Sequence, residues 1–167
     1  MQFGTSIEYA IHGLIYMAGN GRPQGAGAVP ANLLVGDIAK ATRVPESYLR
    51  KVMQLLARAG LVISHRGVKG GFSLALDARE ITLADVVEAV DGSLPTWCCV
   101  KEKKTCGEDP CPVSVAFEEA RQKMAESLAR ITIAQLASQI ARRADDWLAV
   151  TNCFSVRSTF PESRGER

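Results

Sequence analysis

The sequence predicts a mainly α-helical fold with one small β-hairpin, and three stretches of the chain carry this prediction. Two short amphipathic segments, 34–42 and 45–58, are joined by a tight turn. Residues 61–76 contain two short apolar runs around a glycine-rich basic tip, and residues 113–131 place apolar side chains at every third or fourth position. These patterns are typical of a helix-turn-helix, a hairpin and an amphipathic helix. Together they predict a winged helix-turn-helix domain followed by a long dimerisation helix.

Composition and hydropathy indicate which class of protein the chain belongs to and in which compartment we expect it. The chain of 167 residues is 47% hydrophobic and 23% charged, which is ordinary for a globular protein with a core. No apolar run approaches the ~20 residues that span a membrane, and the start of the sequence lacks the basic and apolar regions of a secretory signal. We therefore expect a cytoplasmic protein with no membrane partner.

The first predicted helix covers residues 6–20. Its apolar side chains recur at three- and four-residue steps, at Ile7, Ile11, Leu14, Ile15 and Ala18. Thr5 or Ser6 is expected to cap its start. Glu8 and His12 stand four residues apart and share a face of the helix, either as a surface pair or as two ligands of a site.

The segments 34–42 and 45–58 form the predicted helix-turn-helix. Pro45 suits the first position of the second helix, because its missing N–H and fixed φ carry no penalty there. The side chains expected to be buried across the two helices are Val35, Ile38, Ala39, Leu49, Val52, Met53 and Leu56.

The outer face of the second of these helices carries the predicted DNA contacts. Ser47, Tyr48 and Lys51 lie early and outward, where a recognition helix meets base edges. Arg43 and Arg50 are better placed to neutralise phosphates. The alternative is an ordinary amphipathic helix whose polar face is merely solvated.

Positive charge is concentrated in this part of the chain. Between residues 36 and 72, seven basic residues stand against two acidic ones, so the local charge is seven minus two, or +5, although the whole chain carries only +2. The basic residues are Lys40, Arg43, Arg50, Lys51, Arg58, Arg66 and Lys69. A basic patch confined to one segment is typical of a protein that binds the phosphate backbone.

Residues 61–76 predict a hairpin of two short strands. In the second strand, alternation should bury Phe72, Leu74 and Leu76 and expose Ser73.

The tip of this hairpin, residues 65–71, contains three glycines, which permit a tight turn, and carries Arg66 and Lys69. A basic hairpin directly after a recognition helix is a wing, and an arginine at its tip suits a narrow minor groove. A phosphate-binding glycine loop is the rival, but no helix start and no Lys-Ser/Thr pair follows it.

Three more helices are expected after the hairpin. Residues 80–90 predict one that begins with a capping box at Thr82 and Asp85. A helix of about twenty residues begins at Pro112. A last helix begins with the capping pattern at 132–135 and packs back on the body.

The helix that begins at Pro112 has too little chain beside it to bury its apolar stripe within one subunit. That stripe consists of Val113, Phe117, Ala120, Met124, Leu128 and Ile131. A twofold-symmetric homodimer follows as the expected assembly, and it matches the palindromic form of many operators.

Four of the five cysteines lie within residues 97–112, at Cys98, Cys99, Cys106 and Cys111. In a reducing compartment, clustered cysteines bind metal or undergo redox chemistry more often than they form structural disulfides. Soft thiolates in a loop suit an iron–sulfur cluster. Zinc would prefer two closely spaced cysteine pairs, and only Cys106 and Cys111 come near that spacing. A thiol–disulfide switch is possible beside three lysines, and structurally inert cysteines are the remaining interpretation.

The chain thus divides into four predicted parts. Residues 1–92 form the DNA-binding domain, 93–112 the cysteine-containing sensor loop, 113–150 the dimerisation helix and closing helix, and 151–167 a flexible tail.

Three sequence stretches, PESYLRKV at 45–52, GLVISHRGVKGGFSLA at 60–75 and ITLADVVEAVDG at 81–92, resemble the winged-helix regulators of the IscR, NsrR and RirA type, the Rrf family. The resemblance runs from about Phe3 to Leu148. It implies dimeric regulators of bacterial transcription, many of which bind an iron–sulfur cluster through three cysteines between the wing domain and the dimer helix.

Several residues match functional positions of that family. Ser47, Tyr48 and Lys51 match the recognition-helix readers, and Arg66 matches the minor-groove residue of the wing. The resemblance assigns the cluster ligands to Cys99, Cys106 and Cys111, with Glu8 or His12 of the partner subunit where a fourth, non-cysteine ligand would fall.

The cysteine spacing, six residues and then four, is less even than the family's. Cys98 is an extra candidate ligand, but adjacent residues rarely chelate one cluster, which favours Cys99. The cluster type, 2Fe–2S or 4Fe–4S, stays open.

The expected function is a dimeric bacterial regulator that binds a double-stranded DNA operator under the control of a cluster that senses redox state, nitric oxide, or iron and cluster supply. The alternatives are a cluster-free thiol switch or a zinc-containing regulator, and a winged-helix module for protein interaction. An enzyme is not expected, since the two histidines offer no catalytic constellation and no small-molecule substrate is evident.

Overall fold

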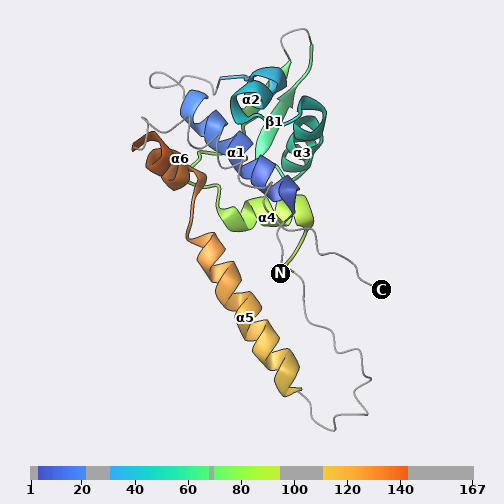
Figure 1. Ribbon diagram of the computed structural model, residues 1–167, viewed down its shortest axis with the longest axis vertical. Helices are drawn as coiled ribbons and strands as arrows, with labels where there is room; N and C mark the ends of the chain where they lie inside the picture. Colours follow the sequence, from blue (N-terminus) through green and yellow to red (C-terminus); the bar gives the residue numbers. More distant parts are fainter. Residues whose placement is uncertain (1–3, 22–30, 68–69, 95–110, 143–167) are drawn as a thin grey trace, which may run out of the picture.

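The computed structural model describes residues 4–21, 31–67, 70–94 and 111–142 (Figure 1). The elements run α1 (Thr5–Asn20), α2 (Val35–Thr42), α3 (Glu46–Arg58), β1 (Val62–His65), β2 (Gly71–Leu74), α4 (Leu83–Asp91), α5 (Pro112–Ala129) and α6 (Ile133–Arg142). The predicted fold class, mainly α with one small hairpin, is confirmed. No helix in the described ranges has the length and apolar character to cross a membrane.

Helix α1 is the centre of the body, and α2, α3, α4 and α6 pack around it (Figure 1). Each of these helices contributes side chains to one continuous core. Its fully buried members include Leu14, Met17, Ile38, Leu49, Met53, Leu56, Val86 and Ile133. Burial of so many aliphatic side chains from five helices fixes the positions of α1 and α3 relative to each other.

Strands β1 and β2 form a two-stranded antiparallel hairpin in which Val62 pairs with Leu74 and His65 with Gly71. Leu33 adds a bridge on the other side of β2, with Phe72 as its partner. A Cβ at Gly71 would lie 2.2 Å from the Leu33 carbonyl oxygen, so only glycine fits there. The connection before α2 is thereby joined to strand β2.

The expected alternation in the second strand is wrong at two positions. Ser73 is only 3% exposed, whereas Leu76 is 45% exposed. Strand β2 ends at Leu74, so Leu76 lies beyond it. Ser73 tolerates burial because its hydroxyl forms a hydrogen bond of 2.8 Å with His65 Nε2 across the hairpin.

The helix starts agree with the sequence in some places and differ in others. Thr82 and Asp85 form the expected capping box of α4, in which the Asp85 N–H donates to Thr82 Oγ1 and the Thr82 N–H donates to Asp85 Oδ2. Thr132 and Gln135 form the same pair of bonds before α6. Pro45 is the N-cap of α3 and not its first residue.

The cap expected for α1 is wrong. Gly4 is its N-cap, and no side chain caps this helix.

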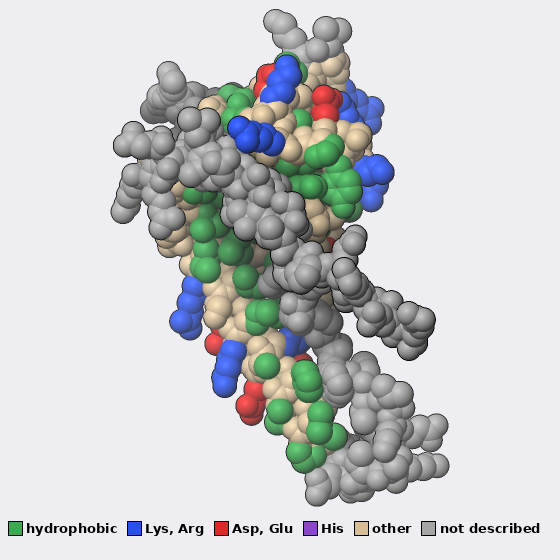
Figure 2. All heavy atoms as spheres, viewed as in Figure 1, with side chains coloured by type: hydrophobic (Ala, Val, Ile, Leu, Met, Phe, Trp, Pro, Cys, Tyr) green, Lys and Arg blue, Asp and Glu red, His purple; other side chains and the backbone are tan. Residues whose placement is uncertain are grey.

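Helix α5 extends away from the body, and α6 then returns to pack on α1 (Figure 1). None of the described side chains of α5 is buried. Val113, Val115 and Phe117 are exposed near its start, and Figure 2 shows hydrophobic side chains on the surface of this end of the helix. The predicted end of the last helix, up to Leu148, lies outside the described residues.

Candidate nucleic-acid interface

The turn between α2 and α3 is held by buried contacts on both sides. The Thr42 hydroxyl donates to the Ile38 carbonyl (2.8 Å), and the Val44 N–H donates to the Ala39 carbonyl (3.1 Å). Between them Arg43 adopts φ 54°, the only non-glycine residue with positive φ among the described residues. This conformation costs a non-glycine residue about 1 kcal/mol. The Arg43 side chain is exposed at this turn, two residues before the N-cap of α3.

Helix α3 separates an apolar face from a polar one. The buried face consists of Leu49, Val52, Met53 and Leu56, as the sequence predicts. The side chains expected to read or neutralise DNA all lie on the exposed face, and they are Ser47, Tyr48, Arg50, Lys51 and Arg58. The apolar contacts therefore orient α3 so that a row of polar and basic side chains is available to a ligand.

One residue of this row has a partner on its own helix. Arg50 Nη2 lies 2.6 Å from Glu46 Oε1, one helical turn earlier, and both side chains are more than half exposed. Exposed pairs of this kind contribute little to stability. Because a guanidinium has five N–H donors, Arg50 keeps donors for a phosphate, but Glu46 reduces the local positive charge.

Tyr48 is fixed by two residues of α1, a contact that the sequence did not reveal. Its hydroxyl lies 2.9 Å from Ser6 Oγ, and its ring meets the Tyr9 ring edge-on, with centroids 5.4 Å apart and an interplanar angle of 86°. Tyr48 is still 40% exposed. Tyr48, on the outer face of α3, is thus held in place by contacts with α1.

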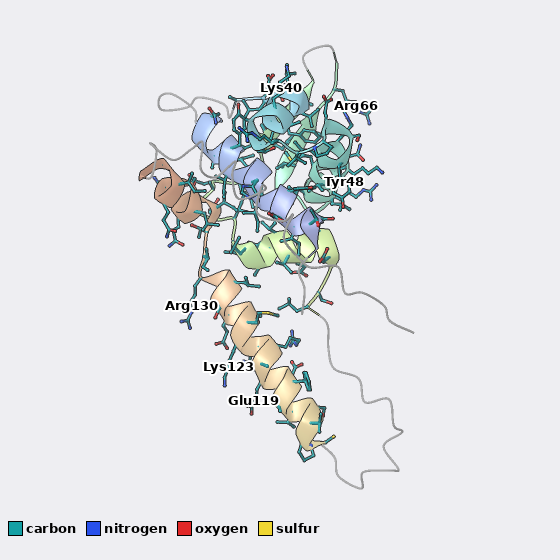
Figure 3. The ribbon with its side chains drawn as sticks, viewed as in Figure 1. Lys40, Tyr48, Arg66, Glu119, Lys123 and Arg130 are labelled. Atoms are coloured by element: carbon teal, nitrogen blue, oxygen red, sulfur yellow. The ribbon has the colours of Figure 1, made fainter. Side chains whose placement is uncertain are left out.

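The hairpin places Arg66 on the exposed surface directly after β1. In Figure 3, Tyr48 and Arg66 lie on the same side of the body, and Figure 2 shows Lys and Arg side chains gathered over this part of the molecule. Lys69, the other predicted residue of the tip, lies outside the described residues. The described part of the wing and α3 together form a polar surface with an excess of basic groups.

Glu8 and His12 are both half-buried on α1. Burial lowers the pKa of His12 below its usual value of 6.5, while the nearby charge of Glu8 acts in the opposite direction. A lowered pKa keeps the imidazole neutral near pH 7, which is the form that binds a metal.

Of the four clustered cysteines, only Cys111 lies within the described residues, where it is the half-buried N-cap of α5. Cys98, Cys99 and Cys106 lie outside them. Among the described side chains, no three His, Cys, Asp or Glu residues come together as a metal site. The predicted ligand set is therefore untested by the geometry.

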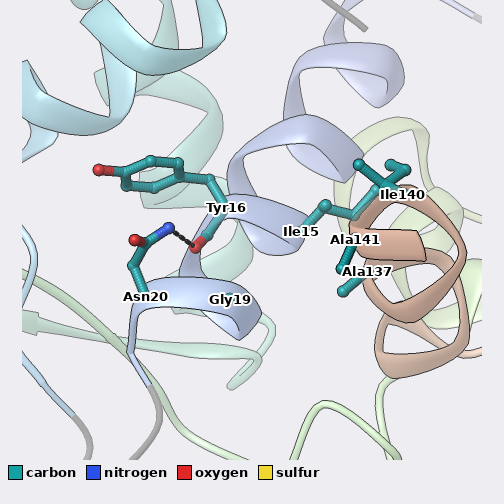
Figure 4. Close-up of a pocket in the computed structure, with 7 residues that line it drawn as sticks. All are labelled: Ile15, Tyr16, Gly19, Asn20, Ala137, Ile140 and Ala141. Atoms are coloured by element: carbon teal, nitrogen blue, oxygen red, sulfur yellow. Dashed lines mark hydrogen bonds between the residues drawn. The ribbon is translucent and has the colours of Figure 1, made fainter. Parts of the chain in front are cut away.

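Two hollows of similar size lie away from α3 and the hairpin. One, of about 260 Å³, lies between α1 and α6 (Figure 4). It is lined by Ile15, Tyr16, Gly19 and Asn20 of α1 and by Ala137, Ile140 and Ala141 of α6. The Asn20 amide there donates to the Tyr16 carbonyl (2.9 Å). The other, of about 250 Å³, lies between α4 and α5, and its lining includes Glu88 and Arg121. The first offers mainly apolar contact, and the second one group of each charge.

Comparison with known proteins places this surface in a family context. Residues 3–139 match the Rrf2 family, described as an iron-dependent transcriptional regulator. A helix-turn-helix transcriptional regulator of Aquifex aeolicus is 31% identical over 139 residues, which cover 81% of this chain and 91% of that one. The transcriptional regulator IscR of Vibrio parahaemolyticus is 31% identical over 130 residues, or 75% of this chain and 77% of that one. The crystal structure of the oxidised form of CymR from Staphylococcus aureus superposes with a TM-score of 0.60 at 25% identity, over 82% of this chain and 96% of that one.

Proposed function

Because this chain belongs to the Rrf2 family of transcriptional regulators, we propose that it controls transcription as a homodimer whose affinity for a DNA operator is set by an iron–sulfur cluster. The chain is a DNA-binding regulator of transcription and not an enzyme, like its relatives. The dimer, the cluster and the individual contacts are the proposed part. We place its action in the cytoplasm, where the operator would be.

The observation that carries the proposal is the exposed face of α3 beside the wing. Ser47, Tyr48 and Lys51 are exposed on the first turns of α3, the part of a recognition helix that meets base edges in the major groove. In the proposed complex, Arg66 enters the adjacent minor groove. The phosphate contacts come from Arg43, Arg50, Arg58 and Lys69.

The homodimer is supported by the surface of α5. This helix has 18 residues and no buried side chain among those described, yet Val113, Val115 and Phe117 are exposed on it. A second copy of the same helix would cover these side chains and present two copies of α3 on one duplex. Twofold assembly of this kind sets two recognition helices about 34 Å apart, one turn of DNA.

The sensor is proposed to lie between the wing domain, 1–92, and the α5–α6 part, 113–150. Cys111 is half-buried at the start of α5, and the other cysteines of the stretch precede it by 5 to 13 residues. Cys99, Cys106 and Cys111 would hold the cluster, with Cys98 as the alternative to Cys99. Glu8 or His12 of the partner subunit would supply the remaining ligand. Thiolates are the usual ligands of iron–sulfur clusters, and neutral imidazole can replace one of them. Such a cluster supplies a centre that responds to oxidants, to nitric oxide or to the supply of iron.

The second candidate is a thiol switch without a cluster. It is favoured by the likeness to CymR, whose structure was determined in an oxidised form. In that case two cysteines of 97–112 form a disulfide, and the DNA affinity follows the redox state of the thiols. A third candidate is a zinc site formed by the same cysteines.

One set of measurements separates these candidates. The protein is purified and reconstituted without oxygen, and its absorption spectrum, iron, sulfide and zinc contents are determined for the wild type and for Cys106→Ala. The proposal expects iron, sulfide and visible absorption in the wild type, loss of all three in Cys106→Ala, and a changed affinity for duplex DNA. Iron-free protein whose DNA affinity responds to oxidant and reductant would favour the thiol switch. Iron-free protein with unaltered DNA binding in Cys106→Ala would contradict any sensing role.

A further inference from the structure

We propose that Ser6 of α1 is a positioning residue for DNA recognition, which orients the Tyr48 hydroxyl so that it donates its proton to an acceptor on the DNA. The inference rests on the proposed DNA-binding function and adds the central helix to the reading surface. It arises from a contact between residues 42 positions apart in the sequence.

The first step is that Tyr48 is held at two points. Its ring meets the Tyr9 ring edge-on, with centroids 5.4 Å apart, which is an orientation that aromatic pairs prefer. Its hydroxyl oxygen lies 2.9 Å from Ser6 Oγ. The neighbouring Leu49 is fully buried, so the backbone beside Tyr48 is anchored in the core. The phenol therefore has one orientation before any ligand arrives, although the side chain is 40% exposed.

The second step is the direction of the proton. Either oxygen could donate in the Ser6–Tyr48 bond. An acceptor on a base edge in the major groove, such as guanine O6 or N7 or thymine O4, has no proton to give, so a Tyr48 hydroxyl that contacts one must donate its own proton. Its oxygen can then accept the proton of Ser6. The resulting order, Ser6 to Tyr48 to DNA, polarises each bond in the same direction and strengthens the outer one.

The Ser6–Tyr48 hydrogen bond can be removed without changing the core. Helices α1 and α3 pack through the buried core, which includes Leu14 and Met53, whereas the Ser6–Tyr48 bond lies on the exposed side. Removing one exposed hydroxyl leaves those apolar contacts intact. Loss of the bond should therefore alter DNA recognition without altering the fold, which a merely structural serine would not do.

The test uses the full-length protein and a duplex selected by the wild type from a pool of random sequences. Affinities for this duplex and for a random-sequence duplex are measured for the wild type, Ser6→Ala, Tyr48→Phe and the double variant. Ser138→Ala is the matched control, because it removes a serine hydroxyl that donates to the Ala134 carbonyl within α6. Thermal unfolding of each variant is measured in parallel.

The expected result is a two- to tenfold weaker affinity of Ser6→Ala for the selected duplex, roughly the effect of one net hydrogen bond. Its affinity for random DNA and its melting temperature should match those of Ser138→Ala. In the Tyr48→Phe background, Ser6→Ala should have no further effect, and Ser6→Thr should restore the wild-type affinity.

Equal losses on both duplexes, or losses that add in the double variant, would overturn the inference. So would a wild-type affinity in Ser6→Ala. Those outcomes leave the proposed function intact, because the wild type has selected a sequence. If the wild type selects no sequence at all, the proposed function fails and the inference fails with it.

Discussion

Replacement of Glu46 by glutamine should change stability and DNA affinity in opposite directions. Glu46 is in the first turn of α3, where its carboxylate lies 2.6 Å from Arg50 Nη2. The substitution keeps the size of the side chain and removes one negative charge from the proposed interface. It raises the local charge between residues 36 and 72 from +5 to +6, counting seven basic residues against one remaining acidic residue.

The magnitudes follow from the exposure of the pair. Loss of an exposed i,i+4 ion pair costs about 0.3–0.5 kcal/mol of folding stability. Loss of an acidic group at the start of a helix adds roughly 0.3–1 kcal/mol. On DNA, a carboxylate about 7 Å from a phosphate is repelled by about 0.6 kcal/mol in water, so its removal should strengthen binding by about threefold. If the freed Arg50 also neutralises one more phosphate, the slope of log K against log salt should steepen by about 0.9.

The assay is a salt titration of binding to random-sequence duplex DNA, with chemical unfolding measured on the same samples. Glu119→Gln is the matched control, since Glu119 is exposed on α5, far from α3 (Figure 3), and its loss changes the net charge equally. Stronger binding in Glu46→Gln alone locates the interface at α3. An equal gain in Glu119→Gln would mean that only net charge matters. Unchanged affinity with reduced stability would refute the assignment of this face to DNA.

Three further changes test other parts of the molecule. Arg66→Ala should reduce the preference for a selected duplex over random DNA while weak binding persists. Arg130→Ala, just after α5, is the control. If the ratio of the affinities for selected and random DNA is unchanged in Arg66→Ala, the wing assignment is contradicted. Phe117→Glu should convert dimer to monomer in sedimentation without unfolding the body. The reason is that burial of the half-exposed Phe117 ring in the interface would contribute roughly 2 kcal/mol per subunit, which the variant loses. A dimer that persists in the variant argues against α5 as the contact. His12 has a lowered pKa in the folded protein, so the unfolded chain binds more protons, and the free energy of unfolding should fall as pH drops below about 6.5. In His12→Gln this fall, measured by urea denaturation at pH 8 and pH 5.5, should be smaller, and identical falls would show that His12 is not its source.

Local patterns predicted most of the fold because each depends on neighbours in the sequence. The four buried side chains of α3 follow a helical period, and the capping boxes before α4 and α6 each require only two residues three positions apart. The prediction of the second strand was wrong at Ser73 because burial there depends on His65, a partner on the other strand. A period of two reports which residues share a face, but not where the strand ends or which polar group finds a partner.

The same reasoning explains why the Ser6–Tyr48 contact was missed. In the sequence, Ser6 is a suitable N-cap, and an N-cap serine uses its oxygen to accept a backbone N–H of the first turn. In the structure Gly4 is the N-cap, so α1 begins before Ser6. The hydroxyl of Ser6 is then not required by its own helix and reaches Tyr48 instead. A shift of one or two residues in the N-cap position, within the usual uncertainty of helix boundaries, thus decides the role of α1 in this proposal. It decides whether α1 only supports the core or also positions a residue of the proposed DNA-reading face.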